Sequence, residues 1–107
     1  MDQIARKAKN FLTATGKVPF REWLNAVDGE GRARINARIR RIEELGNYGE
    51  CEPVGAGVFE LKIYAGPGYR VYFGIDGNLV ILLGGGDKSS QPKDIKKAKT
   101  CWREYNA

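Results

Sequence analysis

The residues of this chain that could do chemistry lie in its second half, between positions 58 and 91. Three cations occur there with tyrosines between them, namely Lys62, Arg70 and Lys88. Positive side chains attract the phosphates of a nucleic acid, and a tyrosine ring can stack on an RNA base for roughly 1–3 kcal/mol. The pattern therefore favours an RNA-binding surface. The rings considered for stacking are Tyr64 and Tyr72, whereas Tyr69 is expected to face the core.

A glycine-rich segment ends the same stretch. Three glycines at 84–86 allow the backbone to approach a ligand closely, and the residues DKSS at 87–90 follow directly before an expected helix. Consecutive N–H groups at the start of a helix can bind a phosphate. The alternative interpretation is a flexible connection with one exposed lysine. The combination with the cations and tyrosines favours the binding site.

Composition limits the classes of function. The 107 residues fit one domain, 1–107, whose first eight or so residues are expected to be frayed. Eighteen Lys and Arg against thirteen Asp and Glu give a formal charge of +5, which favours nucleic acid or an acidic protein as partner. The chain has no histidine, the commonest general base and metal ligand. No metal or other cofactor is therefore expected, and any catalysis must use Lys, Arg, Asp, Glu or Tyr.

Targeting features are typical of a cytoplasmic protein. The N-terminus lacks the apolar segment of a signal peptide, and no apolar run is long enough to span a bilayer, so we expect neither export nor membrane insertion. Cys51 and Cys101 form neither a disulfide framework nor a metal-ligand spacing. We interpret both as reduced thiols.

Hydrophobic periodicity places the candidate residues in an α+β fold. Apolar positions spaced by three and four residues predict helices over 19–27 and 30–45, the second with Gly46 as its C-cap. A short strand within 10–15, a loop over 47–57, strands over 58–64, 69–75 and 79–83, and a final helix capped by Ser89 or Ser90 complete the chain. The order β-α-α-β-β-β-α predicts a compact single domain with its helices packed on one side of a small antiparallel sheet.

Alternation along the strands predicts which side chains share a face. The apolar residues of 58–64 and 69–75 should lie on one side of the sheet. This requires a register that pairs Lys62 with Tyr72 and Tyr64 with Arg70. These four side chains are then expected on one outward face. A turn over 76–78 would leave Gly84 near Arg70. It would also put three apolar residues of the last strand on the core side, namely Leu79, Ile81 and Leu83.

A second basic feature lies on the expected helix 30–45. Arg34, Arg38 and Arg41 follow one another at helical spacing beside the isoleucine stripe. They form either a solvated face paired with nearby glutamates or a contact surface for phosphate or an acidic partner. The sequence leaves both interpretations open.

Several motifs in combination resemble a known family. They are PFREWL at 19–24, VFELKI at 58–63, GPGYRVYF at 66–73 and GGDKSSQ at 85–91. Together they resemble the addiction-module killer proteins of the RelE/ParE superfamily of type II toxin–antitoxin toxins, close to the HigB group. The resemblance covers roughly residues 10–105.

The resemblance implies a bacterial or prophage toxin that arrests growth by cutting mRNA without a metal, in most such systems on the ribosome. The implied partners are mRNA, the ribosome and a helix-turn-helix antitoxin that neutralises the toxin. Two alternatives are open. The ParE branch inhibits DNA gyrase without cutting RNA, and a chain with this fold could also be a non-toxic module that binds nucleic acid or protein.

The resemblance also implies roles for individual residues. Metal-independent RNA cleavage activates the ribose 2′-OH, protonates the leaving 5′-oxygen and stabilises a phosphorane-like transition state. Arg70 matches a recurrent family arginine and is assigned to the phosphate, Lys88 matches a basic catalytic or phosphate-binding position, and Asp87 is the alternative base. An ordinary lysine is protonated at pH 7, so a lysine base would need nearby positive charge to lower its pKa. The other residues expected to bind RNA are Lys62, Tyr64, Tyr72, Ser89 and Gln91.

Overall fold

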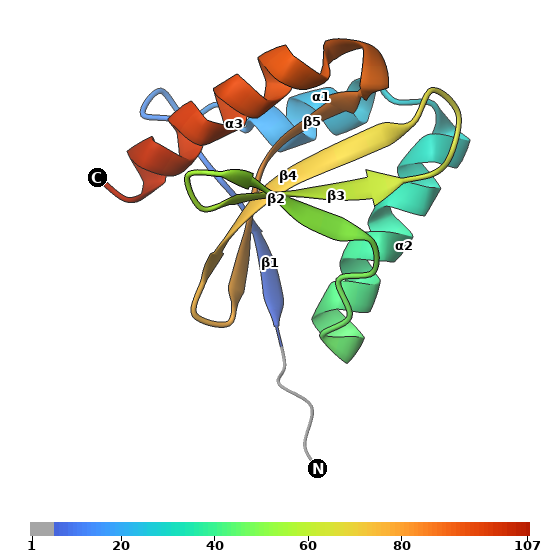
Figure 1. Cartoon of the computed structure of the whole chain (residues 1–107), viewed down its shortest axis with the longest axis horizontal. Helices are drawn as coiled ribbons and strands as arrows, with labels where there is room; N and C mark the ends of the chain where they lie inside the picture. The colour runs from blue at the N-terminus through green and yellow to red at the C-terminus, as the bar shows by residue number, and fades with distance from the viewer. Residues whose placement is uncertain (1–5) are drawn as a thin grey trace.

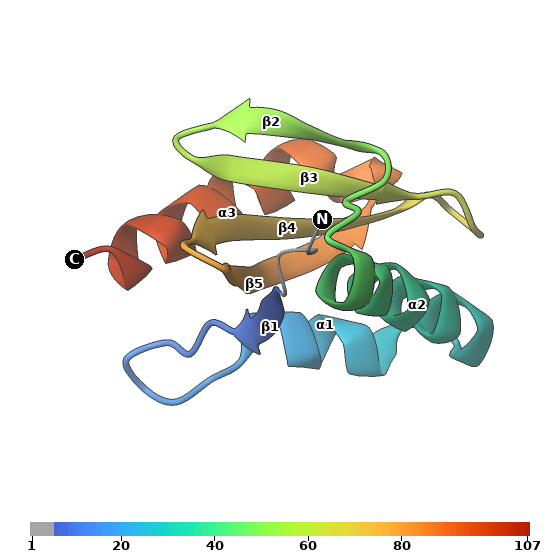
Figure 2. The same ribbon diagram turned by 90° about the horizontal axis from the view of Figure 1, so that it is seen from below.

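One mixed sheet with helices on both faces forms the centre of the molecule (Figures 1 and 2). The computed structural model describes residues 6–107. The strands are β1 (Lys7–Asn10), β2 (Cys51–Gly55), β3 (Val58–Ile63), β4 (Tyr69–Asp76) and β5 (Leu79–Asp87). The helices are α1 (Pro19–Ala26), α2 (Gly29–Leu45), a 3-10 turn (Lys88–Ser90) and α3 (Gln91–Tyr105). The predicted α+β class is confirmed.

The strands lie in the order β1-β5-β4-β3-β2. β1 runs parallel to β5 and the other neighbours are antiparallel, so the sheet is mixed rather than antiparallel as predicted. The N-terminal strand lies at Lys7–Asn10, before the predicted range 10–15, and β2 occupies part of the predicted loop 47–57. Of the residues expected to be frayed, 1–5 lie outside the described part of the chain, whereas Lys7 and Ala8 belong to β1.

The predicted helical hairpin is confirmed. α1 begins at Pro19, where a missing N–H costs nothing, and buries Phe20 and Leu24 one turn apart. α2 buries an isoleucine stripe against the same face of the sheet and ends at Gly46. Gly46 has a left-handed φ of 65°, which favours glycine, and its N–H donates to the carbonyl of Ile42 over 2.9 Å.

Both faces of the sheet are buried, so the prediction that all helices pack on one side was wrong. Figure 2 shows α3 on the opposite side of the sheet from α2. The reason is a second apolar surface, centred on Tyr72, which must also be covered. The sheet residues facing α1 and α2 include Leu61, Ile63, Val71, Phe73, Val80 and Leu82. Those facing α3 are Val58, Tyr72, Ile81 and Leu83.

The register between β3 and β4 differs from the predicted one by two residues. Lys62 pairs with Arg70 and Glu60 pairs with Tyr72, because pairing begins at Ile63 and Tyr69 and leaves residues 64–68 as the connection. A shift of two preserves the alternation of faces. The polar side chains of the two strands therefore still point to one side, although their predicted pairs were wrong.

The turn between β4 and β5 reverses the predicted faces of β5. Asp76 pairs with Leu79, so the turn has two residues instead of three, and Gly77 at its first position has a φ of 62°. Ile81 and Leu83 consequently lie on the α3 side rather than with Leu61 and Phe73. β5 also continues through its glycines, which places Gly84 opposite Tyr72 and Gly86 opposite Arg70.

Among residues 6–107, no helix is both long and apolar enough to cross a membrane. Cys51 and Cys101 are free thiols, as predicted.

The packing of α3 on the sheet predicts a specific sensitivity at Gly74. A Cβ at Gly74 would lie 2.5 Å from the Trp102 ring, whereas a Cβ at Gly84 would meet open space. We expect Gly74→Ala to lower the free energy of unfolding by about 1–3 kcal/mol and Gly84→Ala to change it by less than about 0.5 kcal/mol. Chemical denaturation measures both. Equal midpoints for the two variants would contradict the described packing of Trp102.

Candidate functional site

A buried carboxylate lies between the sheet and the start of α3. Glu60 of β3 is only 1% exposed, and its Oε2 accepts hydrogen bonds from Gln91 Nε2 over 2.7 Å and from the Tyr72 hydroxyl over 3.1 Å. Arg70 Nε lies 4.0 Å from the same oxygen. Glu60, Arg70, Tyr72 and Gln91 are called the Glu60 cluster below. The cluster joins two strands of the sheet to the first residue of α3.

Two polar atoms of the Glu60 cluster lack partners within residues 6–107. They are Glu60 Oε1 and Arg70 Nε, both buried. An unpaired buried polar atom costs about 1–3 kcal/mol, and more when it is charged. Such atoms in a native fold call for a specific explanation, and a ligand that binds both groups would supply one.

The first turn of α3 is fixed over this cluster by close contacts. Gly86 lies opposite Arg70, and a Cβ there would be 1.8 Å from Asp94 Oδ2, so any larger residue would require this carboxylate to move. Ser90 Oγ donates to Asp94, whose negative charge lies near the positive end of the helix dipole. The sequence GGDKSSQ therefore folds so that Gln91 reaches Glu60.

Tyr72 is held in its neutral form. Burial raises the pKa of Tyr72 well above its usual value, and the charge of Glu60 together with the hydrogen bond to it raises the pKa further. A protonated phenol is a hydrogen-bond donor, so Tyr72 serves to orient Glu60. The prediction that Tyr72 lies on an outward surface was wrong, because α3 covers its ring and leaves it 0% exposed.

Lys62 lies on the same sheet face as Glu60, and Tyr64 follows the end of β3. Lys62 Nζ forms an ion pair with Glu52 over 2.6 Å, and this hydrogen bond raises the pKa of Lys62 and lowers the pKa of Glu52. The Tyr64 hydroxyl donates to Glu50, while the side chain is 69% exposed. The structure thus brings together Lys62, Tyr64 and Arg70, with Arg70 buried to 9% exposure.

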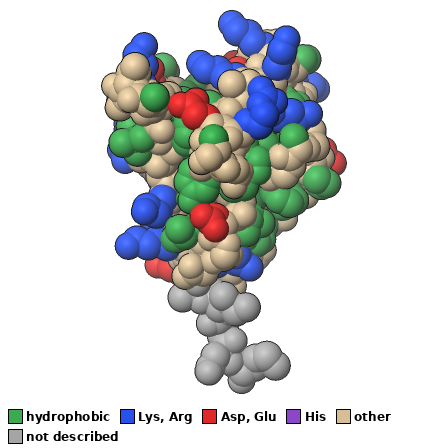
Figure 3. All heavy atoms as spheres, turned by 90° about the vertical axis from the view of Figure 1, so that its left-hand side faces the viewer, with side chains coloured by type: hydrophobic (Ala, Val, Ile, Leu, Met, Phe, Trp, Pro, Cys, Tyr) green, Lys and Arg blue, Asp and Glu red, His purple; other side chains and the backbone are tan. Residues whose placement is uncertain are grey.

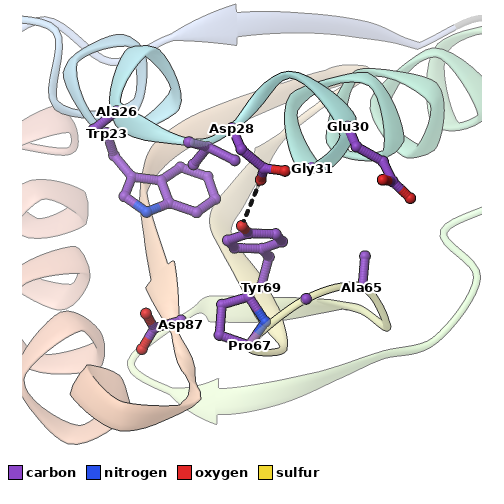
Figure 4. A pocket seen from close by; sticks show the side chains of 11 residues that line it. Trp23, Ala26, Asp28, Glu30, Gly31, Ala65, Pro67, Tyr69 and Asp87 are labelled. Carbon is purple, nitrogen blue, oxygen red and sulfur yellow. Dashed lines mark hydrogen bonds between the residues drawn. The ribbon is translucent and has the colours of Figure 1, made fainter.

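Asp87 and Lys88, at the end of β5, have different surroundings. Asp87 pairs with Tyr69 and lines a pocket on the α1 and α2 side of the sheet, away from Arg70 (Figure 4). Its Oδ1 accepts hydrogen bonds from Ser89 N over 2.8 Å and Ser89 Oγ over 2.5 Å, and these bonds lower the pKa of Asp87. Lys88 is exposed and packs beside Gly68 in the β3–β4 connection.

The arginine stripe of α2 divides into two parts. Arg38 is half-buried and donates to the carbonyls of Lys62 over 2.6 Å and Tyr48 over 3.0 Å, so it ties α2 to the sheet. Arg34 and Arg41 are exposed, and they line a pocket of about 300 Å³ together with Tyr64. Arg34 also forms a surface ion pair with Glu30 over 3.7 Å. The exposed half of the stripe therefore borders the face that carries Tyr64.

The outer surface of α3 adds further positive charge. Figure 3 shows Lys and Arg side chains gathered at the top of the molecule, on the side where α3 runs. The exposed cations of this helix are Lys93, Lys96, Lys97 and Arg103.

Glu60 and Asp94 extend the site beyond the residues predicted from the sequence, whereas Gln91 was predicted there as an RNA contact. Glu60 is two residues before Lys62 on β3, so strand alternation places both side chains on the same face. The side chains of that face were expected to be in solvent. The packing of α3 is what converts Glu60 into a buried acid. Within residues 6–107, His, Cys, Asp and Glu side chains form no group of three that could hold a metal ion.

Comparison with known proteins gives two matches. A family model described as "Phage derived protein Gp49-like (DUF891)" matches residues 22–103. An uncharacterised protein of Haemophilus influenzae is 51% identical over 87 residues, which cover 79% of this chain and 87% of that protein. The matched region includes every residue of the Glu60 cluster.

The Glu60–Arg70 pair predicts strong energetic coupling. Arg70→Met would leave the Glu60 charge buried without a cation, which is expected to cost about 3–5 kcal/mol of stability. In the double variant Glu60→Gln/Arg70→Met that charge is absent. We therefore expect the double variant to lose at least about 1 kcal/mol less stability than the two single variants lose together. Denaturant unfolding of the four proteins gives the coupling energy, and additive costs would contradict the pairing.

Proposed function

Since this chain belongs to the family of phage-derived Gp49-like proteins, we propose that it is the toxin of a type II toxin–antitoxin system. We further propose that it belongs to the RelE/ParE superfamily and cuts mRNA by a metal-independent reaction. The α+β fold, the formal charge of +5 and the basic surfaces around Tyr64 and on α3 support an RNA substrate. Such a protein would act in the cytoplasm, where messages and ribosomes occur.

The observation that carries the proposal is a pair of buried groups, Glu60 Oε1 and Arg70 Nε, for which residues 6–107 provide no hydrogen-bond partner. A scissile phosphate beside Arg70 would give the guanidinium a charged acceptor, and charge-assisted hydrogen bonds of this kind are strong. The ribose 2′-OH next to that phosphate would then donate to Glu60. One ribose-phosphate unit would satisfy both groups.

In the proposed mechanism Glu60 accepts the 2′-OH proton as general base. The 2′-oxygen attacks the adjacent phosphorus, Arg70 stabilises the charge of the phosphorane-like transition state, and the bond to the 5′-oxygen breaks. Glu60 suits the task better than Asp87, because Asp87 lies on the other side of the sheet and its pKa is lowered. The buried Tyr72 hydroxyl donates to Glu60 and orients it, and this pre-organises the base.

The leaving 5′-oxygen needs a proton, and Lys88 is the proposed donor. It is exposed at the end of β5, two residues after the partner of Arg70. Lys62, Ser89 and Gln91 would contact the flanking backbone, and Tyr64 would stack on a base. Gln91 would exchange its bond to Glu60 for one to RNA, which opens the covered cluster to its substrate.

The proposed partners are the ribosome that presents the message and a helix-turn-helix antitoxin that neutralises the toxin. Arg34 and Arg41 would extend the phosphate track beyond Tyr64. DNA gyrase is the partner of the alternative function, a gyrase inhibitor.

Removal of the proposed base should abolish cleavage without unfolding the protein. Induction of the wild type is expected to produce new 5′ ends in cellular messages, mapped by primer extension, and growth arrest. Glu60→Gln keeps the shape and the acceptor for Gln91, so we expect it to fold and to cut at least about 100-fold more slowly.

The matched control is Glu44→Gln, the same change at an exposed position of α2, which should cut like the wild type. Growth arrest without new 5′ ends would contradict the nuclease function. If purified gyrase were also inhibited in a supercoiling assay, the protein would be a gyrase inhibitor. Equal cleavage by Glu60→Gln and wild type would remove Glu60 as the base.

A further inference from the structure

The pocket that Asp87 lines is on the opposite side of the sheet from the Glu60 cluster. It has a volume of about 520 Å³ and opens between the α1–α2 junction and the β3–β4 connection. Figure 4 shows Tyr69 bonded to Asp28 across it, with Trp23 and Asp87 on one side and Glu30 on the other. The volume falls in the range typical of ligand sites and exceeds that of any single side chain.

The charge of this pocket is opposite to that of the whole protein. Its eleven lining residues include three carboxylates, Asp28, Glu30 and Asp87, and neither lysine nor arginine, although Glu30 forms a surface ion pair with Arg34 outside the lining. Asp28 and Asp87 each use Oδ1 to accept hydrogen bonds from within the chain. The negative charges of Asp28 and Asp87 contribute to raising the pKa of Tyr69, after the hydrogen bond to Asp28 and burial. Nucleic acid would be repelled here.

Two aromatic rings form walls that close packing holds in place. The Trp23 ring lies against Gly85, where a Cβ would be 2.2 Å from it, and the Tyr69 ring lies against Gly31, where a Cβ would be 2.6 Å away. The ring centroids are 6.1 Å apart with an edge-to-face angle of 69°. Rings fixed in this way can contact a ligand without losing rotational freedom.

We propose that this pocket binds an arginine side chain of a protein partner. A guanidinium is planar, stacks on aromatic rings and donates several hydrogen bonds in one plane, so it complements Trp23, Tyr69 and the carboxylates together. Under the proposed function, on which this assignment of the partner rests, the partner is the antitoxin. It would occupy the side of β4 and β5 that faces away from the Glu60 cluster.

The pocket shares its strands with the catalytic face. Tyr69 and Arg70 are adjacent on β4 and point to opposite sides, as do Asp87 and Gly86 on β5. A partner held at the pocket would therefore restrain the two strands that position Arg70, and it would adjoin Arg34, which pairs with Glu30 at the edge of the pocket.

Titration with a blocked peptide tests the pocket directly. The chain has two tryptophans, and Trp102 lies against Gly74 on the α3 side, so its indole N–H signal serves as an internal reference for Trp23. Acetyl-Ala-Arg-Ala-amide is expected to shift the Trp23 signal saturably, with a Kd on the order of millimolar, and to leave Trp102 unchanged. The citrulline analogue, which has the same shape without the charge, should bind about fivefold or more weakly.

Asp28→Asn keeps an acceptor for Tyr69 and removes the charge, so it should weaken peptide binding by about threefold, whereas Glu44→Gln should not. Equal binding of the arginine and citrulline peptides, or shifts of equal size at both tryptophans, would overturn the proposal.

The partner is tested with the protein encoded by the neighbouring reading frame, by calorimetry against the wild type, Asp28→Asn and Glu44→Gln. Weaker binding of Asp28→Asn alone supports the pocket as its docking site. Equal affinity for all three overturns this inference while the proposed function stands. Absence of any binding by the three proteins counts against the proposed toxin–antitoxin function. The peptide titration still tests the pocket in that case, because it uses neither RNA nor antitoxin.

Discussion

The hydrogen bonds to the buried carboxylate of Glu60 hold together the strands and the helix at this end of the molecule. Glu60 joins β3 to β4 through Tyr72, and the sheet to α3 through Gln91. A carboxylate in this position is costly unless donors surround it, and the pair with Arg70 offsets only part of that cost at 4.0 Å. Glu60 Oε1 and Arg70 Nε have no hydrogen-bond partner in the described part of the chain, and this is the basis for placing the scissile ribose-phosphate here.

The two faces of the sheet carry different charged groups at this end of the molecule. On the α3 side the strands carry Arg70 and Lys62, each paired with a glutamate, and α3 itself carries exposed lysines. On the side of α1 and α2, Tyr69 and Asp87 belong to an acidic pocket. Because successive side chains of a strand alternate in direction, one short segment of β4 and β5 serves both surfaces.

Much of the fold could be predicted from local pattern. The periodicity of Phe20 and Leu24, the isoleucine stripe and Gly46 indicated both N-terminal helices, and strand alternation placed Lys62 and Arg70 on one face. The errors concern non-local packing. Nothing in the spacing of Tyr72 distinguishes a ring that α3 buries from one in solvent, and so the acid beside it, Glu60, was also missed. The register errors arose from the lengths of two turns, which fix pairing but leave a weak sequence signal.

The most direct measurement for the central claim is the chemistry of the RNA ends. Attack by the 2′-oxygen, with Glu60 as base and Arg70 on the phosphate, leaves a 2′,3′-cyclic phosphate on one fragment and a 5′-hydroxyl on the other. The fragments of messages cut in cells should therefore be ligated to an adaptor at their 5′ ends only after treatment with a polynucleotide kinase and ATP. Fragments that ligate without it would carry a 5′-phosphate, and this result would contradict the proposed use of the 2′-OH.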